Sequence, residues 1–488
     1  MSDLETAPAD VFKTFVNKLG HICDNAKGGK KVTAFAILQL GTIQYYFTSN
    51  QRDEEDYRRT SSYITSILNT LDQMRDDETL SRNASDGRLP RLLRMIIRFN
   101  QSRIKGYICR MREELDFCIN FVRGDRSNEG QAVLQSLEYL KPLLEFSGDA
   151  CNTNTNEFVD GSQKVIQAIS LIYEPFFKEF LRLRTQNNMD RNAPWVVVSH
   201  SIGRLLSYYY AVNILIAAHR TWPQLFVDFE VHWVPSTAPR EPSIPRRLDA
   251  AKILGKMSSD EDTISKYRDY AVVLEQSGIT LNAKITEAVR HNNFLPFVHA
   301  EVNLLDYILR LQKSLREQGN EIPTFFLNDR YIGCSKPTCR LCELYFDHHP
   351  SGVVVRQGHR NMYSEWRAPD VFAADCDTAA RERKITLERM IPIIRDEAFL
   401  NLREKFATSR PNDSHDTPSN VPPLDVLVSQ MNHVVISNTK ERGAGWAAWD
   451  ELSFEPSAES ADSAPELTGS PTGDEDGDID DDSGGAKL

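Results

Sequence analysis

The sequence predicts a mixed α/β protein with a large, mainly helical region and a disordered acidic C-terminal tail. Three patterns support this prediction. Two runs between residues 31 and 49 are rich in β-branched and aromatic residues, as strands are. Most segments between 54 and 292 carry apolar residues at spacings of three and four, which favours helices. From Glu455 to the end, Ser, Asp, Gly and Glu predominate.

The first expected element is a β-hairpin. Residues 31–38 and 42–48 would be its strands, joined by the short Gln39-Leu40-Gly41 connection. A loop through Gly333 is expected further along. Three other segments have strand character, the first of them an edge strand or irregular crossing in a proline-rich stretch: 227–234, 324–327 and 353–356.

The region between the hairpin and residue 292 is expected to be helical, because its apolar residues recur with the period of an α-helix. The predicted helices are 54–76, 88–119, 130–146, 156–186, 198–219 and 258–292.

Composition bounds the class of protein. A chain of 488 residues suggests two or three domains. A formal charge of -12 argues against a protein that coats nucleic acid over its whole surface. No signal peptide is evident in residues 1–10, and no stretch of about 18 apolar residues could span a membrane. We therefore expect an intracellular protein, cytoplasmic or nuclear, with no membrane partner.

Two motifs about forty residues apart carry the chemistry. His299-Ala300-Glu301 opens a predicted helix over 297–317. Cys339 and Cys342 are three residues apart at the start of a second predicted helix, so one helical turn points both thiols the same way. A helix N-terminus also favours thiolate over thiol. One imidazole and two thiolates suit Zn²⁺ and leave a fourth position open for water.

Glu301 is two residues from His299 and is not a ligand in this scheme. It would take a proton from the water and pass it to a ring nitrogen, then to a leaving amine. These residue types are those of a base deaminase.

Cys334 leaves two other interpretations open. If it were a fourth ligand, the zinc site would be closed, and the protein would be a non-catalytic, zinc-stabilised interaction protein. Alternatively, Cys334, Cys339 and Cys342 could form a thiol-based redox or metal sensor, since clustered cysteines in an intracellular chain favour metal or redox chemistry.

These residues resemble the zinc-dependent cytidine deaminase-like superfamily, and more narrowly a deaminase-like family found in many uncharacterised fungal proteins. The resemblance is carried by His299-Ala-Glu, by the run from Tyr331 to Cys342 and by Gly358-His359 with Tyr363 and Trp366. It implies a three-layer α/β/α sheet, zinc held by His299, Cys339 and Cys342, and proton transfer by Glu301. The implied substrate is a cytosine- or adenine-type base, free or within a nucleotide or nucleic acid.

A substrate pocket is expected near these motifs. Its candidate residues are Ser335, His359, Tyr363 and Trp366, whose rings could stack on a base. For Tyr363 and Trp366, packing in the core is an equally good interpretation.

Two features depart from the superfamily pattern. Thr338 stands where a proline usually precedes the first ligand cysteine. The two strands that usually precede the H-x-E helix are also missing just upstream, where 258–292 looks helical. We hypothesise that the hairpin pairs into the deaminase sheet; an independent amino-terminal domain is the alternative. The expected organisation is 1–50 hairpin segment, 51–285 helical region, 286–400 deaminase-like domain, 401–454 linker and short segment, and 455–488 disordered tail.

The segment from Arg88 to Arg112 is the one strongly basic stretch in this acidic chain. It contains eight basic residues and no acidic one: Arg88, Arg91, Arg94, Arg98, Arg103, Lys105, Arg110 and Arg112. It could contact the phosphates of a nucleic acid. The plainer interpretation is a solvated helix face balanced by the acidic residues that follow.

Overall fold

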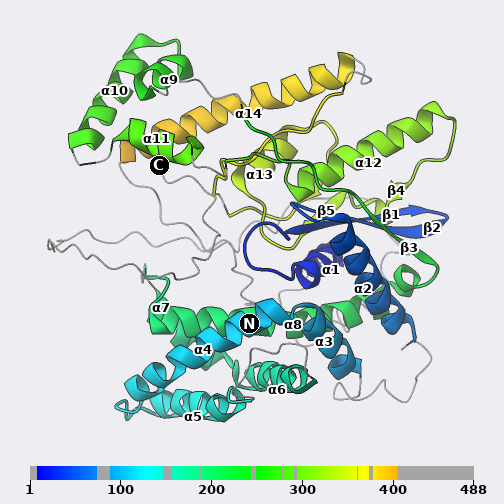
Figure 1. The fold of residues 1–488 in the computed structure, drawn as a ribbon, viewed down its shortest axis with the longest axis vertical. Coiled ribbons are helices and arrows are strands. Elements are labelled where there is room, and N and C mark those ends of the chain that lie inside the picture. Colours follow the sequence, from blue (N-terminus) through cyan, green and yellow to red (C-terminus); the bar gives the residue numbers. More distant parts are fainter. Residues whose placement is uncertain are drawn as a thin grey trace.

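The computed structural model describes residues 8–73, 88–146, 156–186, 190–242, 249–276, 278, 280–290, 294–359, 361–372 and 377–404. The predicted acidic tail and nearly all of the predicted linker lie outside these residues. The fold is mixed α/β, as predicted: helices make up most of the described chain and surround a six-stranded mixed sheet (Figure 1). Among the described residues, no helix is both long and apolar enough to span a bilayer.

The sheet has the strand order β3-β2-β1-β5-β6, and β4 also pairs with β1. β1 and β2 form the predicted antiparallel hairpin, while β2–β3 and β5–β6 are parallel pairs. The strands are β1 (Thr33–Leu40), β2 (Thr42–Ser49), β3 (Phe229–Trp233), β4 (Thr324–Phe325), β5 (Tyr331–Cys334) and β6 (Val354–Val355).

The hairpin joins the strands that flank the metal motif. β1 pairs antiparallel with β5, Ala34 opposite Cys334, and with β4, Leu38 opposite Phe325. Segments about three hundred residues apart in sequence thus share one sheet, which is the pairing hypothesised from the sequence. The domain boundaries themselves remain predictions.

Most helices follow the predicted segments, three of which each form two helices, but the helices Ala250–Met257 and Asp377–Glu404 were not predicted. The bounds of the helices are α1 (Pro8–Cys23), α2 (Glu54–Gln73), α3 (Arg88–Phe99), α4 (Gln101–Val122), α5 (Asn128–Leu143), α6 (Asn156–Ile172), α7 (Pro175–Thr185), α8 (Pro194–Thr221), α9 (Ala250–Met257), α10 (Glu261–Gln276), α11 (Leu281–Arg290), α12 (Ala300–Glu317), α13 (Arg340–His348) and α14 (Asp377–Glu404), with short 3-10 turns at Pro223–Phe226 and Phe326–Asn328.

Local chemistry explains these breaks. Asn100, between α3 and α4, uses its side-chain amide to donate to the carbonyls of Ile22 and Ile96, competing with the helix backbone. Pro175 begins α7, and a residue before proline is disfavoured in a helix. Gly278 lies between α10 and α11 with a φ of +83°, a left-handed conformation that suits glycine.

Three sequence expectations need correction. The predicted loop through Gly333 is wrong, because Tyr331–Cys334 forms β5. A Cβ on Gly333 would meet the backbone nitrogen of Asn17 at 2.8 Å, so the strand exists here through close packing on α1, which the sequence pattern does not report. Helix α1 itself was not predicted. Helix α12 begins at Ala300, not 297, because Phe297 pairs with the segment around Trp366.

The two faces of the sheet bury two different cores. Phe35 and Phe47 point into a large core shared with α1, α2, α3, α4 and α8. Ala34 and Ala36 point the other way, into a smaller core with α12 and α13. The small side chains let α12 approach closely. In Figure 1, α12 and α13 lie on one side of the sheet and α1 on the other, so the centre of the molecule has three layers, α/β/α.

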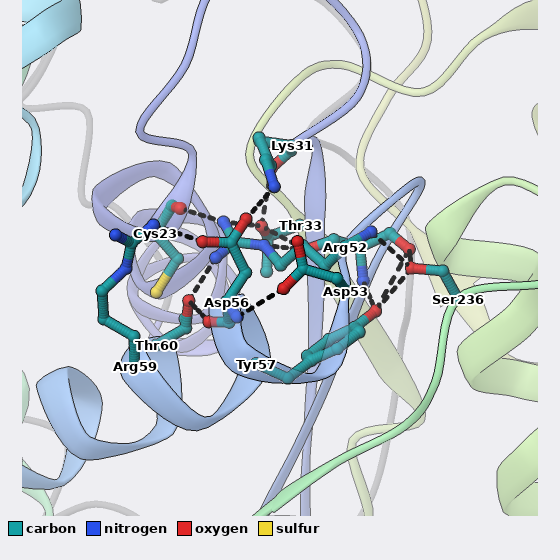
Figure 2. Close-up of polar contacts among 11 residues, drawn as sticks. Cys23, Lys31, Thr33, Arg52, Asp53, Asp56, Tyr57, Arg59, Thr60 and Ser236 are labelled. Carbon is teal, nitrogen blue, oxygen red and sulfur yellow. Dashed lines mark hydrogen bonds and ion pairs between the residues drawn. The ribbon is translucent and has the colours of Figure 1, made fainter.

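Arg52, just after β2, forms hydrogen bonds with several elements next to the sheet. It is 7% exposed. Its guanidinium donates to Ser49 Oγ at 2.8 Å, to Thr60 of α2 and to the carbonyl of Cys23 at the end of α1. Its backbone N–H donates to Ser236, beyond β3, as Figure 2 shows. These hydrogen bonds fix the position of the end of β2.

Candidate metal centre

Two helix N-termini place the three predicted ligands. His299 is the N-cap of α12, Cys339 is the N-cap of α13, and Cys342 lies in the first turn of α13. Both cap residues have extended backbone, with ψ of 154° and 159°. The ligands therefore come from the ends of two helices that pack on the same face of the sheet.

The ligand atoms converge. The Nδ1 atom of His299 lies 3.4 Å from the sulfur of Cys339 and 3.4 Å from that of Cys342. All three ligand atoms lie within 4.8 Å of one another. A tetrahedral zinc ion with the usual Zn–S and Zn–N distances requires N···S edges of about 3.5 Å. The three residues therefore fit a zinc ion, and the sequence-predicted cluster is brought together.

The electrostatics of the site favour a cation. Burial alone would raise the pKa of the Cys339 thiol, but the Cys342 thiol and the His299 imidazole lower it well below its usual value. Burial and the neighbouring Cys339 raise the pKa of Cys342 well above its usual value. The Cys339 thiol therefore ionises more readily than the Cys342 thiol, and a bound metal would favour loss of both protons because thiolate is the binding form.

Glu301 lies beside the cluster without belonging to it. Its side chain is 4% exposed, and burial raises its pKa. The Cys334 thiol lies close enough to Glu301 to lower the pKa of its carboxyl group, against the larger effect of burial. Cys334 is fully buried and is not among the converging ligand atoms. The metal group formed by the described residues therefore has three ligands.

Polar side chains that the sequence reasoning did not include anchor the first turn of α12. Asn50 Oδ1, just beyond β2, accepts the backbone N–H of Ala300 at 2.8 Å. The amide of Asn303 donates to Thr48 Oγ1 at 3.1 Å and to the carbonyl of Pro235 at 2.9 Å. These bonds fix His299 against the end of β2. The only sequence signal was the position of Asn50 directly after a predicted strand.

A second anchor lies on the other side of β5. Asn17 of α1 accepts, through Oδ1, the backbone N–H of Cys334 and the hydroxyl of Tyr331, both at 3.0 Å. Because Cys334 in turn lies beside Glu301, α1 supports the carboxylate from the opposite face of the sheet. Asn17 was also missed, since helix α1 was not predicted.

The segment 358–366 packs tightly against the cysteine loop. Thr338 and Gly358 form a parallel bridge, and the N–H of His359 donates to the carbonyl of Thr338 at 3.1 Å. A Cβ on Gly358 would meet that same carbonyl oxygen at 2.8 Å, so only glycine allows this approach. The residue that departs from the superfamily pattern, Thr338, is thus fully buried and paired through its backbone.

Three of the four predicted pocket residues, His359, Tyr363 and Trp366, lie in this segment. The ring of Tyr363 lies 6.4 Å from that of His299 and 5.7 Å from that of His359. The Trp366 indole packs against the core that contains Cys342 and lowers the pKa of that thiol, against the larger effect of burial. All three are half-buried. Ser335 lies elsewhere: it is 3% exposed, and its hydroxyl accepts the N–H of Thr33 at 3.1 Å, extending the pairing of β5 with β1.

The basic segment does not form one continuous face. It spans two helices, α3 and α4, separated at Asn100. Arg103 is buried and forms an ion pair with Asp24 at 2.8 Å, with both side chains at most 4% exposed. Arg91 and Arg98 of α3 are exposed.

The fold and the site together define an α/β protein with a histidine–cysteine–cysteine metal group at the ends of two helices. Comparison with protein families is consistent with this class. Residues 298–370 match a deaminase-like family model, described as OTT_1508_deam:-like deaminase. The matched range includes His299, Glu301, Cys339 and Cys342. No curated protein and no solved structure matches the chain.

Proposed function

We propose that this protein is a zinc-dependent deaminase that hydrolyses the exocyclic amine of a cytosine- or adenine-type base. The observation that carries the proposal is the convergence of His299, Cys339 and Cys342 beside a buried carboxylate, Glu301. The match of residues 298–370 to a deaminase-like family supports it. A purely structural zinc site has no use for a buried carboxylate at this place, whereas hydrolysis of an amidine requires a proton carrier.

The chemistry divides between the metal and the protein. Zinc, when bound, lowers the pKa of a coordinated water so that water can act as a nucleophile near neutral pH. Glu301 would accept a proton from the attacking water and donate it to the ring nitrogen next to the carbon under attack. After the oxygen has added to that carbon, Glu301 would take the remaining proton of the new hydroxyl group and pass it to the exocyclic nitrogen. The C–N bond breaks, ammonia leaves, and the ring carbon keeps the oxygen as a carbonyl.

Cys334 supports an open rather than a closed metal site. Its thiol lies beside Glu301 and outside the group of converging ligand atoms. Three protein ligands leave a tetrahedral ion one position for water or substrate. In this proposal Cys334 orients the carboxylate that moves the proton.

The aromatic residues near the metal suit a planar heterocycle. Phe297 and Tyr363 flank the His299 ring, with centroids 5.1 and 6.4 Å away. Aromatic side chains bind bases by stacking, whatever the base. We propose that Tyr363 and His359 contact the base, and that Trp366 supports the Cys342 ligand. The proposed substrates are a free base, a nucleotide and a nucleic acid, and all of them contain such a base.

Zinc content tests the metal site. Protein purified without added chelator should contain one zinc per chain, measured by inductively coupled plasma mass spectrometry. His299→Ala, Cys339→Ser and Cys342→Ser should each lose it. Cys334→Ser and Glu301→Gln should keep it. Zinc that also depends on Cys334 would indicate a closed, non-catalytic site, and absence of zinc with a reversible disulfide would indicate a thiol sensor.

Product formation tests the chemistry. Wild-type protein and Glu301→Gln, both shown to hold zinc, are incubated with cytosine and adenine as free bases, nucleosides, nucleotides and oligonucleotides. Hydrolysis adds water, releases ammonia and replaces the exocyclic amine with a carbonyl, so the product is about 1 Da heavier than the substrate. Turnover by wild type that Glu301→Gln lacks supports the proposal. Zinc-loaded wild type that converts none of these substrates contradicts it.

A further inference from the structure

Side chains of α2 and α3 line a groove. These helices lie on the α1 side of the sheet, away from α12 and α13 (Figure 1). The volume of the groove is about 600 Å³. Three arginines of α3 line it together with polar and apolar side chains of both helices: Ser66, Thr70, Pro90, Arg91, Arg94, Met95 and Arg98. Among the described residues no carboxylate lines it, although the chain as a whole carries a charge of -12.

The three arginines share one face of α3. They are three and four residues apart, so they lie on consecutive turns. From Arg91 to Arg98 the helix rises roughly 10 Å, at about 1.5 Å per residue. One strand of a nucleic acid carries a phosphate about every 3.4 Å along its axis. The row of guanidinium groups is therefore long enough for about three phosphates of one strand.

The arginines are available to an incoming anion. Arg91 has no hydrogen-bond or ion-pair partner among the described residues. Arg94 pairs with Asp160 of α6, but the two side chains are 33% and 49% exposed. Arg98 donates to the amide oxygen of Asn156 at 3.0 Å. Exposed pairs of this kind contribute little, so a phosphate can replace them.

An aromatic pair joins the two helices beside the groove. Tyr63 of α2 stacks on Phe99 of α3, with ring centroids 3.9 Å apart and planes 3° from parallel. Both side chains are half-buried, and Phe99 directly follows Arg98 in the chain. A positively charged groove is one of the features of surfaces that track a single strand.

We propose that this groove binds the phosphate backbone of a single-stranded nucleic acid through Arg91, Arg94 and Arg98. A groove with a linear row of charges suits a strand better than a membrane, which would require exposed apolar residues among the basic ones. The site is independent of the proposed deaminase chemistry, because it contains none of the metal residues. If both proposals hold, it would supply affinity for a nucleic acid whose base reaches the zinc centre.

The test is binding without turnover. Full-length protein carrying Glu301→Gln is titrated into fluorescein-labelled oligothymidine or oligouridine of twenty nucleotides, and anisotropy is followed from 50 to 200 mM salt. We expect Arg91→Ala/Arg94→Ala/Arg98→Ala to weaken binding at least tenfold. The slope of log affinity against log salt should fall by about two, since three phosphate contacts to a single strand contribute about 0.7 each.

A matched variant separates the groove from net charge. Arg112→Ala/Arg123→Ala/Arg182→Ala removes the same charge from exposed positions on α4, at its C-cap and on α7. It should change affinity less than twofold. The triple lysine variant of the groove should keep most of the binding, which guards against a folding defect; circular dichroism checks the fold of each protein.

Several results would overturn the proposal. These are no binding by the parent protein at 50 mM salt, equal weakening by the two alanine triples, or tighter binding to heparin or to phosphatidylserine vesicles than to either oligonucleotide. None of them bears on zinc content or on deamination of free bases, so failure of this site leaves the proposed function to its own tests.

Discussion

The two faces of the central sheet differ in how they are built. The face toward α1 and α8 buries a large apolar core, crossed by one ion pair between Asp24 and Arg103. The face toward α12 and α13 buries a smaller core that contains the ligand cysteines themselves. On the first face, packing dominates. On the second, hydrogen bonds from Asn50 and Asn303 hold the metal residues in place.

This difference separates stability from chemistry. Changes on the helical face should lower stability and leave the metal group of folded molecules intact. Changes on the metal face should alter zinc affinity more than overall stability. Each prediction below tests one side of this contrast.

The largest effect is expected at the buried ion pair. Asp24→Ala leaves the Arg103 guanidinium buried without its carboxylate, which typically costs about 3–5 kcal/mol. The urea midpoint should fall strongly, while zinc per folded chain stays at one. Adding Arg103→Met should restore part of the midpoint. Loss of zinc from the folded fraction of Asp24→Ala would show that the two faces are not separable.

The next effect is expected at Asn50, on the metal face. Asn50→Ala leaves the buried N–H of Ala300 without its acceptor, at a cost of about 1–3 kcal/mol. Because this bond fixes the turn that carries His299, we expect zinc affinity to fall roughly tenfold, as about 1.4 kcal/mol implies. Competition with a chromogenic chelator measures it. Asn50→Asp keeps the acceptor and is the control; equal zinc affinity in Asn50→Ala and wild type would contradict the prediction.

Two glycine substitutions sharpen the contrast. At Gly358 a methyl group would meet the Thr338 carbonyl at 2.8 Å, so Gly358→Ala should displace the segment bearing His359 and Tyr363 and cost about 1–3 kcal/mol. At Gly203, within α8, a methyl group meets nothing within 4 Å, so Gly203→Ala should stabilise by about 1 kcal/mol. Thermal midpoints test both signs. If Gly358→Ala and Gly203→Ala shift the thermal midpoint in the same direction, the predicted contrast between the two glycines is wrong.

The smallest effect concerns pH and the helical face. Burial alone would raise the pKa of Tyr107, but Arg103 and Arg204 lower it from 10.0 to about 8. A tyrosine whose pKa is lower in the folded state adds stability that is fully present above the unfolded pKa and is lost as pH falls through the folded value. The stability difference between wild type and Tyr107→Phe should therefore grow from pH 8 to pH 10. A difference that is constant over this range would exclude the shift.

The sequence determined the elements that depend on local pattern. Alternation and β-branching located the hairpin, and the spacing of apolar residues located most helices, since both report which side of an element is buried. The convergence of His299, Cys339 and Cys342 was also predictable, because metal chemistry restricts the residue types and a helical turn fixes the spacing of the cysteines; their role as ligands stays a prediction. Breaks such as that at Asn100 were not, because a side chain bonding to a distant carbonyl decides them.

Tertiary structure decided everything that depends on distant partners. Strand β5 forms around Gly333 because α1 and β1 lie against it, and no local pattern of four residues reports that contact. Cys334 lies beside Glu301 rather than in the metal group, and Ser335 pairs with Thr33, because β5 is held at that register. The residue types near a motif indicate which side chains could bind a metal. Only the pairing of segments some three hundred residues apart determines which of them point at one another.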